Sequence, residues 1–143
     1  MTAPASLVML ARQAAERHQL DSSLVCAVIE QESDWEQWAA RYEPVFEQMY
    51  VARLRLADRT EQTLRSISWG LMQVMGQVAR ENGFAGALPS LCLPLNGLEV
   101  GCKVLAHKLA VNEGNVTRAL LAWNGGGNPQ YAAEVLARAG NYA

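Results

Sequence analysis

The chain has 143 residues, half of them hydrophobic and 18% charged, which suits one globular domain with a single core. A formal net charge of -2 without a basic block argues against nucleic acid or an anionic membrane surface as the main partner. No apolar run approaches the length of a membrane span, and residues 1–10 lack the basic residue and apolar stretch of a signal peptide. We therefore expect a single domain, residues 1–143, that does not insert into a membrane.

Hydrophobic periodicity predicts helices along most of the chain, beginning with residues 6–18. Asp21 is placed to cap a second helix, which ends at Glu32. Pro44 favours the start of a third helix. Residues 53–65 are polar and charged, and we expect them to form the end of that helix and a loop.

The second half of the chain continues the helical pattern. Ser68 opens a helix that Asn82-Gly83 ends, and residues 85–94 read as a connection rich in Leu and Pro. Further helices are predicted over residues 96–111, 116–123 (capped by Asn115) and 129–138, the last after a glycine-rich turn. Since no stretch alternates apolar and polar residues, the predicted fold class is all-α, with about seven helices.

One acidic residue continues the apolar face of the second helix. Glu32 lies four residues after Val28 and three after Ile29, so its carboxyl group should face the edge of the core, whereas Glu30 points away. Burial and the negative end of the helix dipole would both raise the pKa of Glu32. An acid that stays protonated near neutral pH suits general acid catalysis. A helix-end glutamate that bends out to solvent is the alternative.

The cysteines and histidines show no spacing typical of a metal site. Cys26 and Cys102 fall in apolar helical contexts and are expected in the core, and a Cys92–Cys102 bridge is left open without support. His18 and His107 are isolated and are expected on helix surfaces. We predict no metal, no cofactor and no catalytic cysteine.

Four local features follow one another along the chain, and each alone has a purely structural explanation. They are the helix end Glu32-Ser33, the turn Ser66-Ile67-Ser68 before Gly70-Leu71-Met72-Gln73, the junction Ala122-Trp123-Asn124-Gly125-Gly126, and Tyr131. In this order they resemble the lysozyme-like lytic transglycosylases, the soluble lytic transglycosylase (SLT) domain family related to goose-type lysozyme. The match spans residues 26–135, and Gly70-Leu71-Met72-Gln73 is its most specific element.

The resemblance implies a lysozyme-like fold and a role for each matching residue. Glu32 would be the catalytic acid/base, and Ser68, or alternatively Ser66, would hold the N-acetyl group of the sugar or the acid. The other implied contacts with the glycan are Met72, Gln73, Trp123, Asn124 and Tyr131.

The chain also departs from the family pattern. Trp123 stands where the family commonly has Tyr, which puts a hydroxyl donor near the acid in doubt, although an indole offers a stacking face and one N–H. The segment between Ser33 and Gly70 is longer than usual, and we expect its Trp35 and Trp38 to add aromatic faces to a glycan groove.

We therefore expect an enzyme that cuts the β-1,4 bond between N-acetylmuramic acid and N-acetylglucosamine in peptidoglycan. No second carboxylate is as constrained as Glu32, so we predict 1,6-anhydro-muramoyl ends. The alternative is a muramidase that uses Glu43 or, more weakly, Asp58. Two other classes stay open: an inactive glycan-binding module and a helical assembly protein.

The expected place of action is the cell wall, and the expected state is a monomer. A chain without a recognisable leader fits a phage or prophage lysis or tail enzyme, a secretion-apparatus accessory, or a protein whose leader has been removed.

Overall fold

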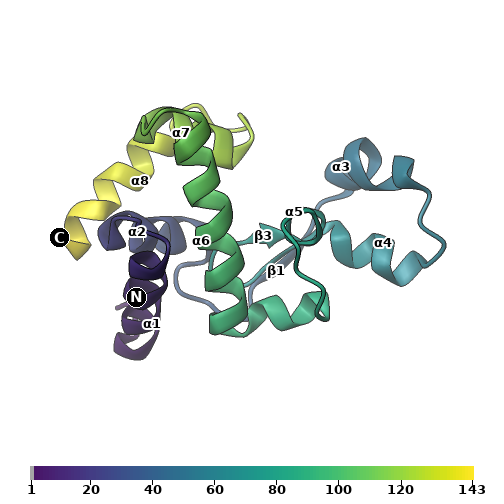
Figure 1. The fold of residues 1–143 in the computed structure, drawn as a ribbon, viewed down its shortest axis with the longest axis horizontal. Helices are drawn as coiled ribbons and strands as arrows, with labels where there is room; N and C mark the ends of the chain where they lie inside the picture. Colours follow the sequence, from purple (N-terminus) through teal and green to yellow (C-terminus); the bar gives the residue numbers. More distant parts are fainter. Residues whose placement is uncertain (1) are drawn as a thin grey trace.

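The computed structural model describes residues 2–143, and these residues are mostly helical, as predicted (Figure 1). The α-helices are α1 (Ala5–Arg17), α2 (Ser22–Ser33), α3 (Pro44–Phe46), α4 (Arg59–Arg65), α5 (Gly76–Glu81), α6 (Pro94–Val111), α7 (Val116–Asn124) and α8 (Tyr131–Ala139). The strands are β1 (Ala40–Tyr42), β2 (Ile67–Trp69) and β3 (Val74–Met75). Short π and 3-10 turns are η1 (Glu47–Val51), η2 (Ala52–Leu54), η3 (Leu88–Cys92) and η4 (Gly140–Tyr142).

The long helix α6 lies between two groups of elements (Figure 1). On one side, α1, α2, α7 and α8 pack together, and both chain ends lie there. On the other side lie the sheet and the helices α3, α4 and α5. The strands are antiparallel in the order β1-β2-β3. Within residues 2–143, no helix is both long and apolar enough to cross a membrane.

The predicted helix caps are confirmed. The side chain of Asp21 accepts a hydrogen bond of 2.8 Å from the backbone N–H of Ser23, and Asn115 accepts one of 2.9 Å from Arg118. Helix α2 ends one residue later than expected, at Ser33. These caps fix the start of α2, which carries Glu32, and of α7, which carries Trp123.

The predicted helix from Ser68 is wrong over its first half. Residues 67–69 and 74–75 are strands, joined by a turn in which Gly70 and Gln73 have φ of +74° and +50°. These left-handed conformations are incompatible with a helix. At Gly70 a Cβ atom would lie 2.6 Å from the carbonyl oxygen of Leu91, so the position also has no room for a side chain. The strands are too short to show an alternating pattern.

The expected loop at residues 53–65 is also wrong in its second half, because α4 forms there. Asp58 caps this helix by accepting a 2.8 Å hydrogen bond from the N–H of Thr60. Glu61 pairs with Arg65 one turn later at 2.6 Å and with Arg80 of α5 at 2.8 Å. Charged residues therefore stabilise this helix. The sequence analysis missed it because helices were predicted from a stripe of apolar residues, which this segment lacks.

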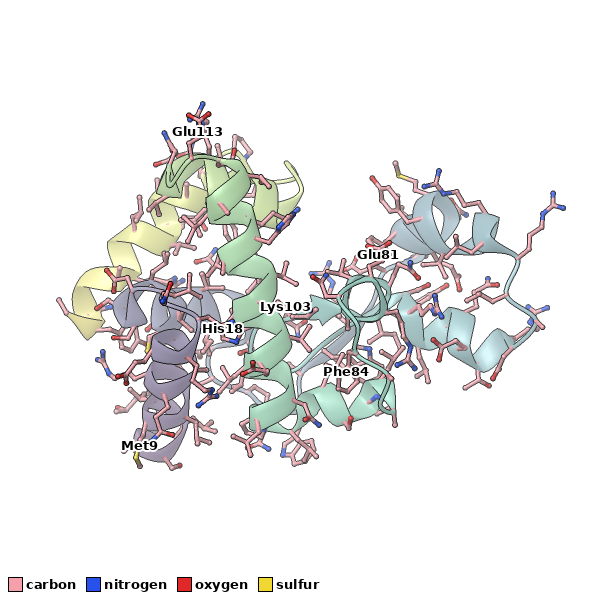
Figure 2. The ribbon with its side chains drawn as sticks, viewed as in Figure 1. Met9, His18, Glu81, Phe84, Lys103 and Glu113 are labelled. Carbon is pink, nitrogen blue, oxygen red and sulfur yellow. The ribbon has the colours of Figure 1, made fainter. Side chains whose placement is uncertain are left out.

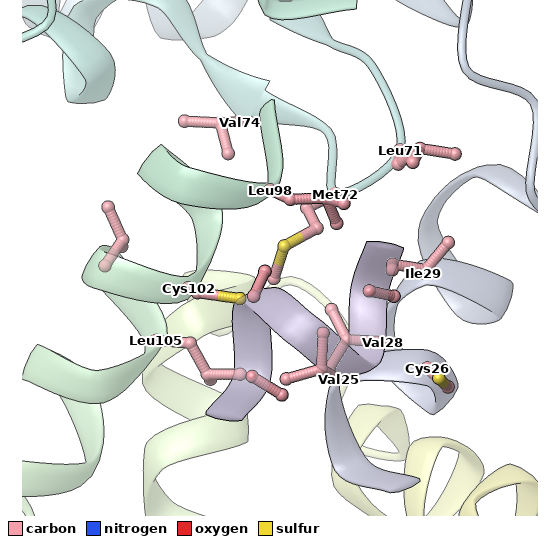
Figure 3. Close-up of a cluster of buried hydrophobic side chains, with 14 of the residues drawn as sticks. Val25, Cys26, Val28, Ile29, Leu71, Met72, Val74, Leu98, Cys102 and Leu105 are labelled. Carbon is pink, nitrogen blue, oxygen red and sulfur yellow. The ribbon is translucent and has the colours of Figure 1, made fainter. Parts of the chain in front are cut away.

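Helix α2 provides the centre of the core. All residues from Leu24 to Ile29 are buried, and in Figure 3 Val25, Val28 and Ile29 lie near side chains of the 71–74 segment and of α6. Met72 is fully buried against α6, where a Cβ atom on Gly101 would lie 2.4 Å from its sulfur. Leu71 and Val74, expected on the buried face of a helix from Ser68, are buried although they lie in a turn and a strand instead.

The cysteines behave as core residues, as expected for Cys26 and Cys102. All three are buried and free, so there is no Cys92–Cys102 bridge. Burial raises the pKa of Cys26 to about 11 and that of Cys102 to about 12, which keeps both thiols protonated and inert. His18 lies 2.8 Å from a carboxylate oxygen of Glu99.

Charged side chains lie on the outside of the molecule. Figure 2 shows Glu113 and the exposed Met9 at opposite ends of the helical group, and Lys103 on the side of α6 that faces α5, where its Nζ donates to the carbonyl oxygen of Asn82 at 2.8 Å. His107 is exposed, as predicted.

We expect Gly101→Ala to destabilise the fold by about 1–3 kcal/mol, because the added methyl group overpacks the contact with Met72. Thermal unfolding followed by circular dichroism measures this. Gly140→Ala is the matched control, since no heavy atom lies within 4 Å of its Cβ position and its φ is -59°. Equal melting temperatures for the two variants would contradict the prediction.

Candidate active site

Glu32 lies in the last turn of α2, where the helix is held from both directions. Asp34 and Trp35 have φ of +49° and +65°, which ends the helix just beyond Glu32. The hydroxyl of Ser33 lies 2.8 Å from the carbonyl oxygen of Leu71 and 3.2 Å from that of Ile29. Ser33 therefore ties the end of α2 to the turn between β2 and β3.

Two side chains from the C-terminal helices donate hydrogen bonds to one oxygen of Glu32. The Tyr131 hydroxyl lies 2.6 Å from Oε2, and the Trp123 indole N–H donates to the same atom at 3.2 Å. Tyr131 is buried at the start of α8, and Trp123 is half-buried near the end of α7. The presence of Trp at position 123 had put a hydroxyl donor near the acid in doubt. Tyr131 provides that hydroxyl, and the indole N–H of Trp123 is a second donor.

The second oxygen of Glu32, Oε1, has no hydrogen-bond partner among residues 2–143. No buried side-chain nitrogen or oxygen in that part of the chain lacks a partner, so Oε1 must reach solvent. The carboxyl group therefore has one oxygen fixed by the protein and one open to a ligand.

Burial raises the pKa of Glu32, as the sequence analysis expected. The hydrogen bonds from Tyr131 and then Trp123 act in the opposite direction, but burial is the larger effect. Burial also raises the pKa of Tyr131, and the neighbouring Glu32 carboxylate raises it further. Tyr131 therefore remains a protonated donor while Glu32 can take up or release a proton.

Glu30 points away from Glu32, as expected, and its carboxylate contacts side chains of the C-terminal segment. It accepts a 2.6 Å hydrogen bond from the Tyr142 hydroxyl and pairs with Arg138 of α8. The Tyr142 hydrogen bond and the Arg138 charge lower the pKa of Glu30. The two glutamates on one helix end thus have opposite shifts, a pattern that separates an ion-pairing carboxylate from a candidate acid.

Trp35 was expected to offer a sugar-stacking face, and this is wrong. It is only 3% exposed, and its indole N–H donates to the Tyr142 hydroxyl at 2.9 Å. Trp38, by contrast, is 62% exposed. Tyr142 was missed by sequence reasoning, because a tyrosine at the end of the chain shows no pattern that links it to α2.

Ser68 and Gln73 are brought together, with most of their polar atoms engaged inside the protein. The Ser68 hydroxyl donates to Gln73 Oε1 at 2.9 Å, and Gln73 Nε2 donates to the carbonyl oxygens of Ala39 and Gly70 at 3.1 and 2.9 Å. The alternative residue, Ser66, is fully buried and donates to the carbonyl of Gln62, outside this cluster. These bonds hold the turn beside the end of α2, and direct contact of Ser68 or Gln73 with a glycan stays a prediction.

Met72 and Asn124 support the site from two directions. Met72 is 0% exposed, so its side chain has no surface to offer a ligand, and it packs under the turn. Asn124 ends α7 and accepts a 2.9 Å hydrogen bond from the N–H of Asn128. Gly125 and Gly126 follow with φ of +80° and +85°, a left-handed conformation that glycine adopts without strain. This turn reverses the chain and returns α8 to Glu32.

The other candidate carboxylates are engaged in their own segments. Glu43 pairs with Arg41 at 3.1 Å, and Asp58 caps α4. Asp34 is exposed beyond the end of α2. No group of three His, Cys, Asp or Glu side chains in residues 2–143 could hold a metal ion.

A half-buried acid at the end of a core helix, in a helical domain with a small antiparallel sheet, is the arrangement of lysozyme-like glycan-cleaving proteins. The comparison with protein families agrees with this class. The model of the transglycosylase SLT domain matches residues 9–141, and the chain belongs to this family, whose members cleave peptidoglycan. Neither the curated proteins nor the solved structures gave a match.

We expect Glu32→Gln to keep the fold, because the two side chains have nearly the same shape, and to lower turnover of purified sacculi by about 10²–10⁴-fold or more. Sacculus clearance and thermal unfolding are measured together. Glu113→Gln, an exposed and distant acid, is the control. A folded Glu32→Gln protein with nearly wild-type clearance would overturn the assignment.

Tyr131→Phe tests the tuning of the acid. Its hydroxyl stabilises the charged form of Glu32, so its loss should raise the pKa of Glu32 further and move the alkaline fall of kcat/KM to higher pH. The pH profile of kcat/KM on soluble glycan strands measures this. Tyr50→Phe, at an exposed tyrosine, should leave the profile in place. A shift to lower pH after Tyr131→Phe would contradict the proposed effect.

Proposed function

We propose that this protein cuts the β-1,4 bond between N-acetylmuramic acid and N-acetylglucosamine, with Glu32 as its single general acid/base. The observation that carries the proposal is the asymmetry of the Glu32 carboxyl group. Oε2 accepts hydrogen bonds from Tyr131 and Trp123, whereas Oε1 has no protein donor among residues 2–143 and reaches solvent. A proton on this carboxyl group is best placed on Oε1, since Oε2 already accepts two hydrogen bonds.

In the first step, the proton on Oε1 of Glu32 passes to the glycosidic oxygen while the bond from that oxygen to C1 of the muramoyl sugar breaks. N-acetylglucosamine leaves with a new hydroxyl group, and positive charge develops on the muramoyl ring. Glu32 becomes a carboxylate, and the donors Tyr131 and Trp123 then stabilise its charge.

In the second step, Glu32 takes the proton from the C6 hydroxyl of the same muramoyl sugar, and the C6 oxygen bonds to C1. Because this nucleophile belongs to the reacting sugar, it has an effective-molarity advantage over water. The step returns the proton to Glu32 and closes a 1,6-anhydro ring, so no water is consumed.

The mechanism requires Glu32 to be a neutral acid in the first step and a carboxylate in the second, and its surroundings suit both states. Burial favours the neutral acid required in the first step, and the two hydrogen bonds to Oε2 limit the cost of the carboxylate required in the second. Glu43, the candidate for a hydrolytic second carboxylate, is paired with Arg41, which supports the mechanism with a single acid. We place the action in the cell wall. A phage or prophage context and a monomeric state remain predictions.

The product decides between the two mechanisms. We expect mass spectrometry of digested sacculi to show 1,6-anhydro-muramoyl ends, which are lighter than hydrolytic ends by one water. Reducing muramoyl ends throughout would make the protein a muramidase, and Glu43→Gln would then be the variant to compare with Glu32→Gln. Binding to sacculi without any cleavage would instead identify an inactive glycan-binding module.

A further inference from the structure

One asparagine organises the turn between α7 and α8 from within. The N–H of Asn128 donates to Oδ1 of Asn124 at 2.9 Å, and Oδ1 of Asn128 accepts from the N–H of Gln130 at 2.9 Å. The carbonyl oxygen of Asn128 accepts from the N–H of Tyr131 at 3.1 Å. Asn128 therefore fixes the backbone that connects Trp123 to Tyr131, the two donors to the candidate acid.

A second acidic side chain ties this turn to α2, the helix that packs along α8 (Figure 1). Glu134 lies in the first turn of α8. Its Oε1 accepts a 3.2 Å hydrogen bond from Nδ2 of Asn128, and its Oε2 accepts a 2.8 Å hydrogen bond from Nε2 of Gln31. Gln31 immediately precedes Glu32 on α2. Glu134 thus bridges the turn that carries the donors and the helix end that carries the acid.

The surroundings of Glu134 favour its charged form. The hydrogen bond from Gln31 and then that from Asn128 lower the pKa of Glu134, and the charge of Arg138 on the same helix adds to them. Gln31 on α2 and Asn128 in the turn are themselves uncharged. The carboxylate of Glu134 therefore has both oxygens engaged, each by a different element.

Glu134 makes no hydrogen bond with Glu32, so its influence on the acid must pass through the two donors. Burial raises the pKa of Glu32, and the hydrogen bonds from Tyr131 and then Trp123 lower it. Hydrogen bonds weaken steeply when their distance or angle changes. The strength of both bonds therefore depends on where the turn places the two donor side chains.

We propose that Glu134 is a positioning residue, which anchors the turn between α7 and α8 to α2 so that both donors keep their hydrogen bonds to Glu32. The inference rests on the proposed function, in which Glu32 transfers the proton. A carboxylate suits this position because both of its partners are N–H donors and each binds a different oxygen. A glutamine has only one oxygen, so it would turn its NH2 group toward one of the two donors.

Glu134→Gln tests the proposal with almost no change in side-chain shape. A less firmly held turn weakens the hydrogen bonds to the carboxylate form of Glu32, so the pKa of Glu32 should rise and the alkaline fall of kcat/KM should move to higher pH. The shift should be smaller than that of Tyr131→Phe, which removes one of these bonds outright. Because the side chain of Glu134 is exposed, we expect kcat/KM on soluble glycan strands to fall by only about 2- to 10-fold.

Two measurements are made on the folded protein, whose thermal unfolding is followed in parallel. One is the pH profile of kcat/KM, and the other is the NMR titration of the Glu32 carboxyl carbon, assigned with Glu32→Gln. The matched control is Glu16→Gln, which removes the same charge from an exposed position on α1 and should leave both measurements unchanged.

The direction of the shift separates positioning from a direct effect of charge. Removing a negative charge that acts on Glu32 through space would lower the pKa of Glu32, opposite to the expected rise. In a Tyr131→Phe protein, Glu134→Gln should raise this pKa by less than in the wild type, because one of the two hydrogen bonds that it protects is already absent.

A lowered or unchanged pKa of Glu32 in Glu134→Gln would overturn the inference, and so would a rise of equal size with and without the Tyr131 hydroxyl. The NMR titration does not depend on turnover. A wild-type protein that fails to cut sacculi would therefore overturn the proposed function, while the titration would still show whether Glu134 holds the donors on Glu32.

Discussion

The hydrogen bond from Tyr131 to Glu32 joins residues 99 positions apart over 2.6 Å, so it forms only when α2, α7 and α8 meet at one point. Helix α2 is anchored by its buried residues. The packing of α8 against α2 is the most extensive between any two elements of the described chain. The turn at Gly125 and Gly126 then sets where α8 begins. The acid is thus a product of helix packing, and the rest of the site depends on that packing.

A second set of side chains, here called the clamp, holds the other side of the end of α2. Arg138 and Tyr142 hold Glu30, and the Trp35 indole holds Tyr142 in turn. These contacts connect the C-terminal segment to the last turn of α2 and to Trp35, two residues beyond its end. Two carboxyl groups two residues apart can then differ in pKa. The Tyr142 hydrogen bond and the Arg138 charge lower the pKa of Glu30, whereas at Glu32 burial outweighs the hydrogen bonds from Tyr131 and Trp123 and raises the pKa.

The apolar pattern of the sequence predicted most of the longer helices, the buried face of α2 and the raised pKa of Glu32. Val28 and Ile29 are buried, Asp21 caps α2, and burial raises the pKa of Glu32 as the helical stripe indicated. Periodicity carries this information because it records which face of a helix is removed from water.

The strands and the clamp could not be predicted in the same way. Strands of two or three residues show no period, and the left-handed residue Gln73 has no local signal in its residue type. Trp35 was assigned to the surface, because its burial depends on Tyr142 from the opposite end of the chain. What sequence reasoning missed are therefore contacts between distant segments that leave no trace in local spacing.

The distribution of unpaired polar groups separates the structural part of the molecule from the part that meets a ligand. No buried side-chain nitrogen or oxygen in residues 2–143 lacks a hydrogen-bond partner. At the end of α2, Oε1 of Glu32 has no partner among residues 2–143 and reaches solvent, while Oε2 accepts two hydrogen bonds. The turn between β2 and β3 is held to this helix end by the Ser33 hydroxyl and to Ala39 by the Gln73 amide. The half-buried carboxyl group of Glu32 is therefore held through one oxygen by the fold and keeps the other oxygen available for a ligand.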